Sequence, residues 1–169
     1  MSSKKILLTG YSGFLGRYVL GYLKKKHTKI IKLGRDENSD VKWNLLSKVP
    51  QEINAEIVIH IAGKAHSIPK TKKDTEHFFD VNFHGTIKLV ESLNLKKLKS
   101  FIFISTVAVY GLDNGNLVDE SYPLLGSSPY SLSKIKAEKY LVNFGKTNNI
   151  NVVILRLPLI TGANPIGNL

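Results

Sequence analysis

The sequence of 169 residues contains no cysteine and only five histidines. The lack of cysteine excludes disulfides and thiolate metal ligands, and it fits a reducing compartment, so we expect a cytoplasmic protein. The five histidines are not spaced as metal ligands, and we therefore predict no metal site. No apolar run reaches the length of a transmembrane helix, so we expect no insertion into a membrane.

Acidic residues are scarce, with 13 Asp and Glu against 24 Lys and Arg, which gives a net charge of +11. The lysines gather at residues 24–26, 70–73 and 96–99, in expected helix ends and loops, with no aromatic residues interleaved. This pattern is typical of solvated helix faces, and we expect no nucleic-acid partner. The positive field would still favour an anionic ligand such as a nucleotide.

Short apolar runs alternate with longer amphipathic segments along the whole chain. The expected strands span 6–9, 29–33, 41–43, 57–62, 101–104 and 152–155, and the expected helices span 14–26, 74–94 and 129–145, with a helix or turn at 45–49. Continuous apolar strands separated by helices indicate a parallel sheet covered on both faces. With right-handed crossovers, the sequence predicts one α/β domain over residues 1–169: a doubly wound parallel sheet, or Rossmann fold, in three αβα layers.

A glycine-rich turn follows the first apolar run. Gly10 permits a tight turn, Gly13 lets the backbone approach a pyrophosphate, and Gly16 lets helix and strand pack closely. The free N–H groups of the following helix would attract phosphates. Glycines in any strand–turn–helix are weak evidence alone, but this position in the chain favours dinucleotide binding over a plain turn.

The acidic residue expected after the second strand is missing, because Leu33-Gly34-Arg35 stands at that place. A glycine there removes the repulsion of a 2′-phosphate, and Arg35 could pair with that phosphate, which favours NADP slightly over NAD. Two alternatives remain open at this point. Arg35 could face the solvent, and Asp36 or Glu37 could bind the ribose from a shifted loop.

Tyr130 and Lys134 are spaced four residues apart, which puts a phenol and an ammonium on one face of the expected helix. An ammonium close to the phenol would lower the pKa of Tyr130 toward neutrality and make it a proton donor and acceptor. Ser105 and Thr106 end the fifth expected strand, at the sheet edge where open α/β sheets bind ligands. One of these hydroxyls would orient a substrate oxygen.

Three further polar residues fall near the same edge. A buried Asn82 would need hydrogen-bond partners, and it could join two strands or hold a water near the site. His60 ends the fourth expected strand and is interpreted as structural. His66 follows Gly63 at the ligand edge and could touch a substrate, although a structural role is the stronger interpretation for it too.

Six motifs occur in the order typical of one family: Thr9-Gly-Tyr-Ser-Gly-Phe-Leu-Gly16, His60-Ile-Ala-Gly63, Val81-Asn82-Phe-His-Gly85-Thr86, Ser105-Thr106-Val-Ala-Val-Tyr110-Gly111, Tyr130-Ser-Leu-Ser-Lys134 and Leu155-Arg156-Leu-Pro158. With them the chain resembles the extended short-chain dehydrogenases/reductases of the NAD-dependent epimerase/dehydratase group, which act on nucleotide sugars. The stretch 156–162, with Gly167-Asn168-Leu169, resembles members related to UDP-glucose 4-epimerase that serve surface polysaccharide synthesis.

The resemblance implies a role for each matching residue. Tyr130 would be the acid/base, Lys134 would hold the nicotinamide ribose, and Thr106 would supply the catalytic hydroxyl. The full set of expected cofactor-binding residues, which includes the glycine turn and Arg35, is Gly10, Ser12, Gly13, Phe14, Leu15, Gly16, Arg35, Asn44, Leu45, Ala62, Gly63, Asn82, Tyr130, Lys134 and Pro158. The implied cofactor is NAD or NADP, and the implied substrate is a nucleoside diphosphate sugar.

The family continues well past the position of Leu169, through a smaller substrate domain, so we expect this chain to be the cofactor-binding part. Dehydratases usually carry an acidic residue after the catalytic hydroxyl, whereas Val107 follows Thr106 here. This difference favours an epimerase or a reductase. A non-catalytic NAD(P)-binding module, acting as a redox sensor or partner subunit, remains the alternative, and a homodimer is left open.

Overall fold

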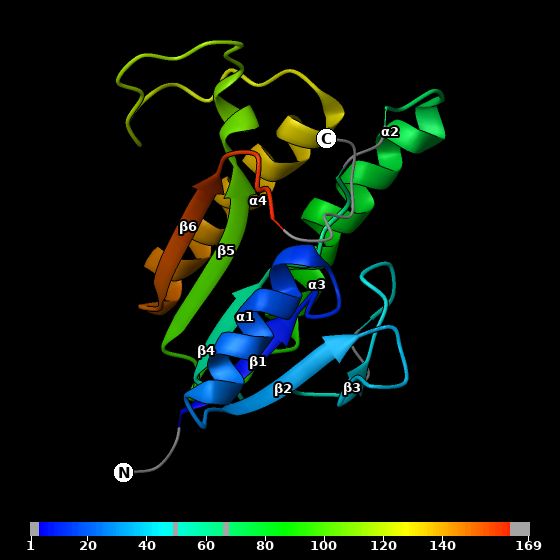
Figure 1. Cartoon of the computed structure of the whole chain (residues 1–169), viewed down its shortest axis with the longest axis vertical. Coiled ribbons are helices and arrows are strands. Elements are labelled where there is room, and N and C mark those ends of the chain that lie inside the picture. Colours follow the sequence, from blue (N-terminus) through cyan, green and yellow to red (C-terminus); the bar gives the residue numbers. More distant parts are fainter. Residues whose placement is uncertain (1–3, 49–50, 66–67, 163–169) are drawn as a thin grey trace.

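The computed structural model describes residues 4–48, 51–65 and 68–162, and these form one parallel sheet with helices on both sides (Figure 1). The strands are β1 (Lys5–Thr9), β2 (Lys29–Gly34), β3 (Val41–Lys42), β4 (Ile57–His60), β5 (Ser100–Thr106) and β6 (Asn151–Leu157). Their order across the sheet is β3-β2-β1-β4-β5-β6. All neighbours are parallel. This order confirms the predicted doubly wound α/β fold.

The helices are α1 (Phe14–Lys25), α2 (Lys72–Phe79), α3 (Gly85–Glu91) and α4 (Pro129–Asn148), with a short 3₁₀ turn at Val107–Tyr110. Alternation along β1 explains the two hydrophobic layers, because successive side chains of a strand point to opposite faces. Leu7 packs on one face with α3 and α4 residues such as Leu89 and Leu141. Ile6 and Leu8 pack on the other face, under α1.

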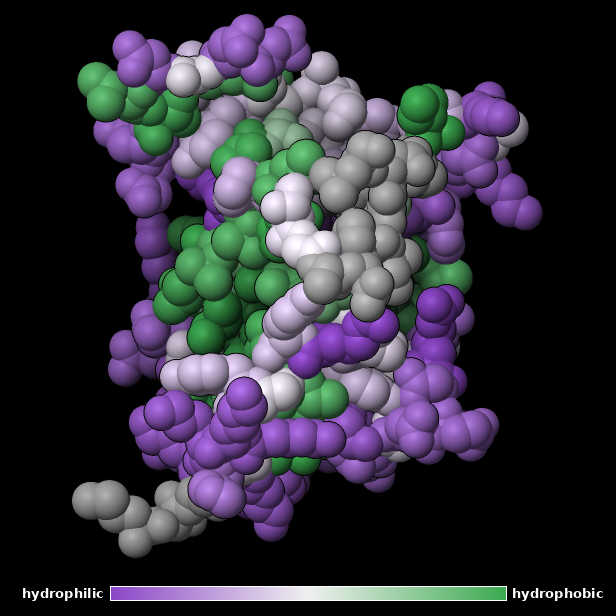
Figure 2. Space-filling view, viewed as in Figure 1, coloured by the Kyte–Doolittle hydropathy of each residue, from purple (hydrophilic) through white to green (hydrophobic). Residues whose placement is uncertain are grey.

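Helix α1 lies over the middle of its face of the sheet, while α3 and α4 cover the opposite face (Figure 1). Apolar side chains are exposed on the α1 side of β5 and β6 (Figure 2), and Leu155 of β6 is 40 % exposed. Within the described ranges, no helix has both the length and the hydropathy that a membrane crossing requires.

The single helix expected over 74–94 is instead a run of three segments. A π-helical turn at Asp80–His84 separates α2 from α3. The run also begins earlier than expected, because Thr71 accepts a hydrogen bond from the Asp74 N–H and the Asp74 carboxylate accepts one from the Thr71 N–H. Wide turns of this kind occur often at functional sites, and buried Asn82 lies in this one.

Strand β4 ends at His60, two residues before the predicted end at Ala62. The Ala62 N–H leaves the ladder and donates to the Thr9 hydroxyl at 3.1 Å. The segment expected as a helix or turn at 45–49 is a turn as far as it is described, and Val49 lies outside the described residues.

Two glycines of α1 allow a direct test of this packing. A Cβ on Gly16 would lie 2.0 Å from the Gly10 carbonyl oxygen and 2.7 Å from the Tyr11 Cα, whereas a Cβ on Gly21 would meet nothing within 4 Å. We expect Gly16→Ala to lower the free energy of unfolding by at least ~2 kcal/mol, because rigid backbone must move. Gly21→Ala should raise it by roughly 0.5–1 kcal/mol through helix propensity. Urea denaturation measures both, and similar values for the two variants would contradict this account.

Candidate active site and cofactor cavity

A cavity of about 1060 Å³ opens at the carboxyl edge of the sheet, where the strand order reverses between β1 and β4. Most of the residues expected to bind cofactor or to act in catalysis line it: Gly10, Ser12, Gly13, Phe14, Leu15, Gly16, Arg35, Asn44, Leu45, Ala62, Gly63, Thr106, Tyr130 and Pro158. Asn82 and Lys134 are not among the lining residues. The structure therefore brings together residues from the ends of all six described strands.

The glycine turn forms the floor of this cavity beside α1. Gly10 has φ of 68° and its Cβ position is 2.6 Å from the Ala62 N, so this residue has to be glycine. The Gly13 N–H donates to the Gly10 carbonyl at 3.1 Å. Gly13 caps α1 without a side-chain hydrogen bond, and the first turn of α1 carries no acidic residue. The positive end of the helix dipole is therefore available to an anion.

Tyr130 and Thr106 lie together on the opposite wall. Thr106 ends β5 and its hydroxyl accepts from the Ala108 N–H at 3.2 Å. Tyr130 lies in the first turn of α4, which begins at the Ser128 cap, and its ring contacts Phe78. Burial raises the pKa of Tyr130, while a hydrogen bond with the Thr106 side chain acts in the opposite direction.

Lys134 lies beneath the cavity, 5 % exposed, one helical turn after Tyr130. Its ammonium donates to the Ile104 carbonyl at 2.7 Å and lies 4.4 Å from the centre of the Phe103 ring. A Cβ on Gly63 would be 3.5 Å from the Lys134 Nζ, so the ammonium lies close behind this cavity-lining glycine. Burial lowers the pKa of Lys134 to about 8, and the nearby Glu138 carboxylate opposes that shift.

The expectation that Lys134 lowers the pKa of Tyr130 is wrong for this structure. The ammonium is directed at the carbonyl of Ile104 in β5, and burial of the phenol dominates the pKa of Tyr130. The helical spacing did bring the two residues to adjacent turns of one helix. It did not determine which way the flexible lysine side chain points.

A buried network that sequence reasoning missed holds α4 against β5 and β6. Glu138, 2 % exposed, accepts from the Ser105 hydroxyl and from Arg156, whose Nη2 is 2.9 Å from the Glu138 Oε2. Arg156 Nη1 also donates to the Tyr110 hydroxyl at 3.0 Å and to the Glu120 carbonyl at 3.1 Å. The available signal was the spacing of Glu138, four residues after Lys134, on the same face of a helix.

Asn82 does find the partners that its burial requires. Its amide oxygen accepts from the Lys64 N–H at 2.7 Å, and its amide nitrogen donates to the Lys64 carbonyl at 2.9 Å and to the Ser133 hydroxyl at 3.0 Å. Asn82 therefore ties the loop after β4 to α4, which places Gly63 over Lys134. It supports the cavity wall from behind.

His60 is structural, as expected, because its two ring nitrogens pair with the hydroxyls of Thr9 at 2.7 Å and Thr86 at 3.1 Å. Burial lowers the pKa of His60 to about 3, so the ring is neutral at physiological pH. His66 lies outside the described residues. Among the described residues, no three His, Asp or Glu side chains lie close enough together to hold a metal ion.

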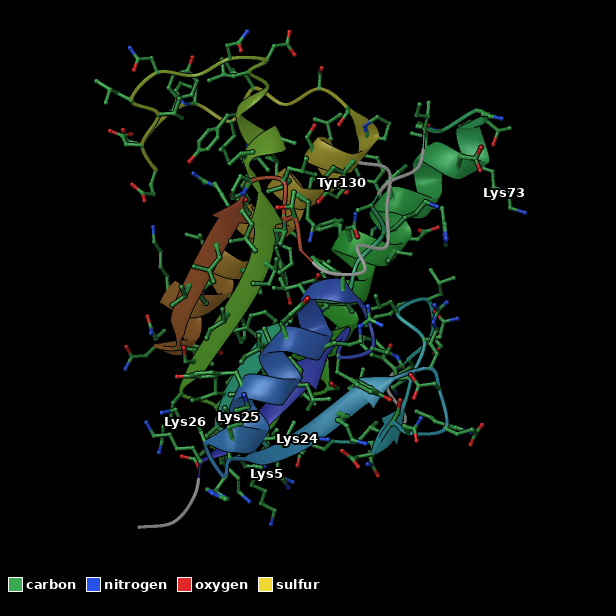
Figure 3. The ribbon with its side chains drawn as sticks, in the orientation of Figure 1. Lys5, Lys24, Lys25, Lys26, Lys73 and Tyr130 are labelled. Atoms are coloured by element: carbon green, nitrogen blue, oxygen red, sulfur yellow. The ribbon has the colours of Figure 1, made fainter. Side chains whose placement is uncertain are left out.

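Beside the end of β2, Arg35 lines the cavity, whereas Asp36 and Glu37 do not. The surface lysines labelled in Figure 3, by contrast, mostly lie far from the cavity. Figure 3 shows Lys5 and the group Lys24, Lys25 and Lys26 at the amino end of the sheet, opposite Tyr130. The local charge of the cavity therefore depends on Arg35, Lys64 and buried Lys134 more than on the surface lysines.

The strand order, the glycine turn and the position of the cavity define a Rossmann fold. The family model described as "NAD dependent epimerase/dehydratase family" matches residues 6–168. The chain therefore belongs to the NAD-dependent epimerase/dehydratase family.

Individual relatives agree with this assignment. The chain is 33 % identical to a dTDP-D-glucose 4,6-dehydratase of Dictyostelium discoideum over 94 % of this chain and 44 % of that protein. It is 32 % identical to a UDP-glucose 4-epimerase of Vibrio cholerae over 94 % of this chain and 52 % of that protein. The solved structure of RMD from Pseudomonas aeruginosa, complexed with NADPH, superposes with a TM-score of 0.75 at 26 % identity. The match covers 92 % of this chain and 54 % of that one. The chain thus spans about half the length of the relatives that it matches.

The buried network gives a second test of the structure. Glu138→Gln keeps the side-chain volume but removes the charge that faces Arg156, which is only 18 % exposed. We expect it to lower the free energy of unfolding by ~3 kcal/mol, because breaking a buried pair leaves one charge uncompensated. Glu76→Gln, in the exposed pair with Lys72, is the matched control and should change it by less than about 0.5 kcal/mol. Equal effects of the two variants in urea denaturation would show that the buried network stabilises the fold no more than an exposed ion pair does.

Proposed function

We propose that this chain is the cofactor-binding and catalytic part of an NAD(P)-dependent enzyme that acts on a nucleoside diphosphate sugar. The observation that carries the proposal is that Thr106 and Tyr130 line the same cavity as the glycine turn, with Lys134 directly behind the wall. The relatives named as a 4-epimerase and a 4,6-dehydratase of nucleotide sugars, and the neighbour complexed with NADPH, support this substrate and cofactor class.

The chain's residues would divide the work by position. The glycine turn and the start of α1 would bind the pyrophosphate through backbone N–H groups. Arg35, Asn44 and Leu45 would surround the adenosine end, and Ala62, Gly63 and Pro158 would border the nicotinamide end. When bound, the nicotinamide supplies the acceptor and donor of hydride.

Tyr130 would move the proton of the sugar hydroxyl, and Thr106 would orient that oxygen. The raised pKa of Tyr130 keeps the phenol protonated at neutral pH, so in this structure it can donate a proton to a carbonyl oxygen. Removing a proton from a hydroxyl requires a lower pKa. Rotation of the Lys134 ammonium away from the Ile104 carbonyl and toward the phenol would provide it.

The reaction best supported by these residues is epimerisation or ketone reduction at a sugar carbon. A dehydration needs an acid for the leaving hydroxyl, and Val107 stands next to Thr106 where an acidic residue would serve. The half of the relatives' length that this chain does not span would supply further contacts with the sugar. We assign to residues 1–169 the cofactor domain.

The second candidate is a non-catalytic NAD(P)-binding module that senses redox state or partners another chain. Two features favour it: the Lys134 ammonium is occupied by a backbone carbonyl, and the pKa of Tyr130 is raised. Under this alternative, Tyr130 and Thr106 would be dispensable, whereas the glycine turn would still be needed. Separate substitutions on the two walls of the cavity therefore distinguish the candidates.

Cofactor binding is tested first. A Cβ on Gly13 would lie 3.3 Å from the Gly10 carbonyl oxygen, a contact that needs a shift of a few tenths of an ångström, and a Val there would occupy space that a pyrophosphate would need. We expect Gly13→Val to weaken NADPH and NADH binding at least about tenfold, or ~1.4 kcal/mol, in fluorescence titrations. Gly21→Ala, on the same helix, should leave both affinities unchanged. Equal binding by wild type and Gly13→Val would disprove the phosphate-binding role of this turn.

Turnover is tested second, in the protein isolated at its native length with UDP-sugars as substrates. Tyr130→Phe should lower kcat by ~10²–10⁴, the contribution of a general acid/base, with little change in cofactor affinity. Lys134→Ala should lower both kcat and the affinity for the cofactor. Residues 1–169 alone should bind cofactor with negligible turnover, because little of the chain remains to orient the sugar. Normal turnover by Tyr130→Phe would show that Tyr130 is not the acid/base, whereas cofactor binding without turnover in the native-length wild type would favour the non-catalytic alternative.

A further inference from the structure

Tyr11, inside the glycine turn, makes a contact that the binding of a pyrophosphate does not require. Its ring is 6 % exposed, and its hydroxyl donates to the Asp36 Oδ1, in the loop after β2. The Ser39 hydroxyl is 3.1 Å from the same phenol oxygen. This tyrosine therefore links the loop that faces the pyrophosphate to the loop that faces the adenosine ribose.

Gly34 makes room for this link. A Cβ on Gly34 would lie 3.0 Å from the Tyr11 Cε1 and 3.0 Å from the Ser39 Oγ. A larger residue at the end of β2 would press on the tyrosine ring. The missing acidic residue at this position is thus explained by the packing of Tyr11, in addition to any effect on a 2′-phosphate.

The Asp36 carboxylate accepts hydrogen bonds from further donors in the two loops that Tyr11 joins. Besides Tyr11, the Asn38 N–H donates to it at 3.0 Å, and the Ser12 side chain forms a further hydrogen bond. The hydrogen bond from Tyr11 is the main cause that lowers the pKa of Asp36, whereas burial raises the pKa of Tyr11. At neutral pH, a neutral phenol therefore donates to a charged carboxylate.

The two neighbouring residues Arg35 and Asp36 differ in their position relative to the cavity. Arg35 lines the cavity and Asp36, the next residue, does not. A carboxylate at the end of β2 accepts hydrogen bonds from the ribose hydroxyls of NAD and repels the 2′-phosphate of NADP, whereas an arginine pairs with that phosphate. The direction in which Asp36 is held thus decides which charge a dinucleotide would meet.

We propose that Tyr11 is a specificity-determining residue for NADP, because it holds the Asp36 carboxylate away from the cavity and leaves Arg35 to meet the 2′-phosphate. This inference rests on the proposed function, since it requires a nicotinamide dinucleotide in this cavity. It goes beyond that function by assigning cofactor selection to a residue of the glycine turn that touches neither the 2′-phosphate nor the nicotinamide.

The test is the ratio of the dissociation constants for NADPH and NADH, measured by fluorescence titration of the 169-residue chain. Tyr11→Phe keeps the ring and removes the donor, so the freed carboxylate should weaken NADPH binding roughly threefold to tenfold, as expected for one added surface charge contact. NADH binding should be unchanged or stronger. Tyr22→Phe, at an exposed position of α1, is the matched control and should leave the ratio unchanged.

A double-mutant cycle identifies the carboxylate as the cause. In an Asp36→Asn background, Tyr11→Phe should no longer alter the NADPH to NADH ratio, because no charge is released. Asp36→Asn alone should leave the ratio within about twofold, because a carboxylate held away from the cavity repels little across the intervening solvent. This single surface variant also tests the inference if Tyr11→Phe folds poorly.

The outcomes are distinct. If wild type binds neither dinucleotide, the proposed function fails and this inference fails with it. If wild type binds and Tyr11→Phe has the wild-type ratio, only the inference is overturned. A large shift toward NADPH in Asp36→Asn would likewise overturn it, because the carboxylate would already face the cofactor in the wild-type protein.

Discussion

The close approach of three backbone segments at the end of β1 is the constraint on which the rest of the molecule depends. Gly10 lies against Ala62, two residues after the end of β4, and Gly16 of α1 lies against the Gly10 carbonyl, with no room for a Cβ at either position. These contacts set the distance between α1 and the sheet and open the crevice between β1 and β4. The cavity and the exposed start of α1 follow from that packing.

Polar contacts behind the opposite wall of the cavity also hold the site in place. Asn82 fastens the loop after β4 to α4, and the Glu138–Arg156 pair fastens α4 to β6 and to the loop that contains Glu120. Tyr130 and Lys134 are carried by the same helix between these two attachments. Their placement is therefore a result of buried polar groups satisfied on both sides, which are costly to leave unpaired.

The predicted elements and the observed ones agree best where a pattern has a local physical cause. The glycine turn, the strand runs and the start of α4 were predicted correctly, because steric freedom, burial on both faces and capping act over a few neighbouring residues. The interruption of the long helix at Asp80–His84 was not predicted, since nothing in its apolar spacing signals a π turn. The end of β4 also differed, because the Thr9 hydroxyl captures the Ala62 N–H from a distant strand.

The sequence by itself therefore determined the class of fold, the glycine turn between β1 and α1, and the positions of Tyr130 and Lys134 one turn apart on α4. Each depends on spacing within one element or on the order of elements along the chain. Only the tertiary structure decided that Lys134 bonds to Ile104, that Glu138 and Arg156 pair, and that Tyr11 holds Asp36. These contacts join groups that are 18 to 30 residues apart in the chain, and their direction depends on burial and on competing partners.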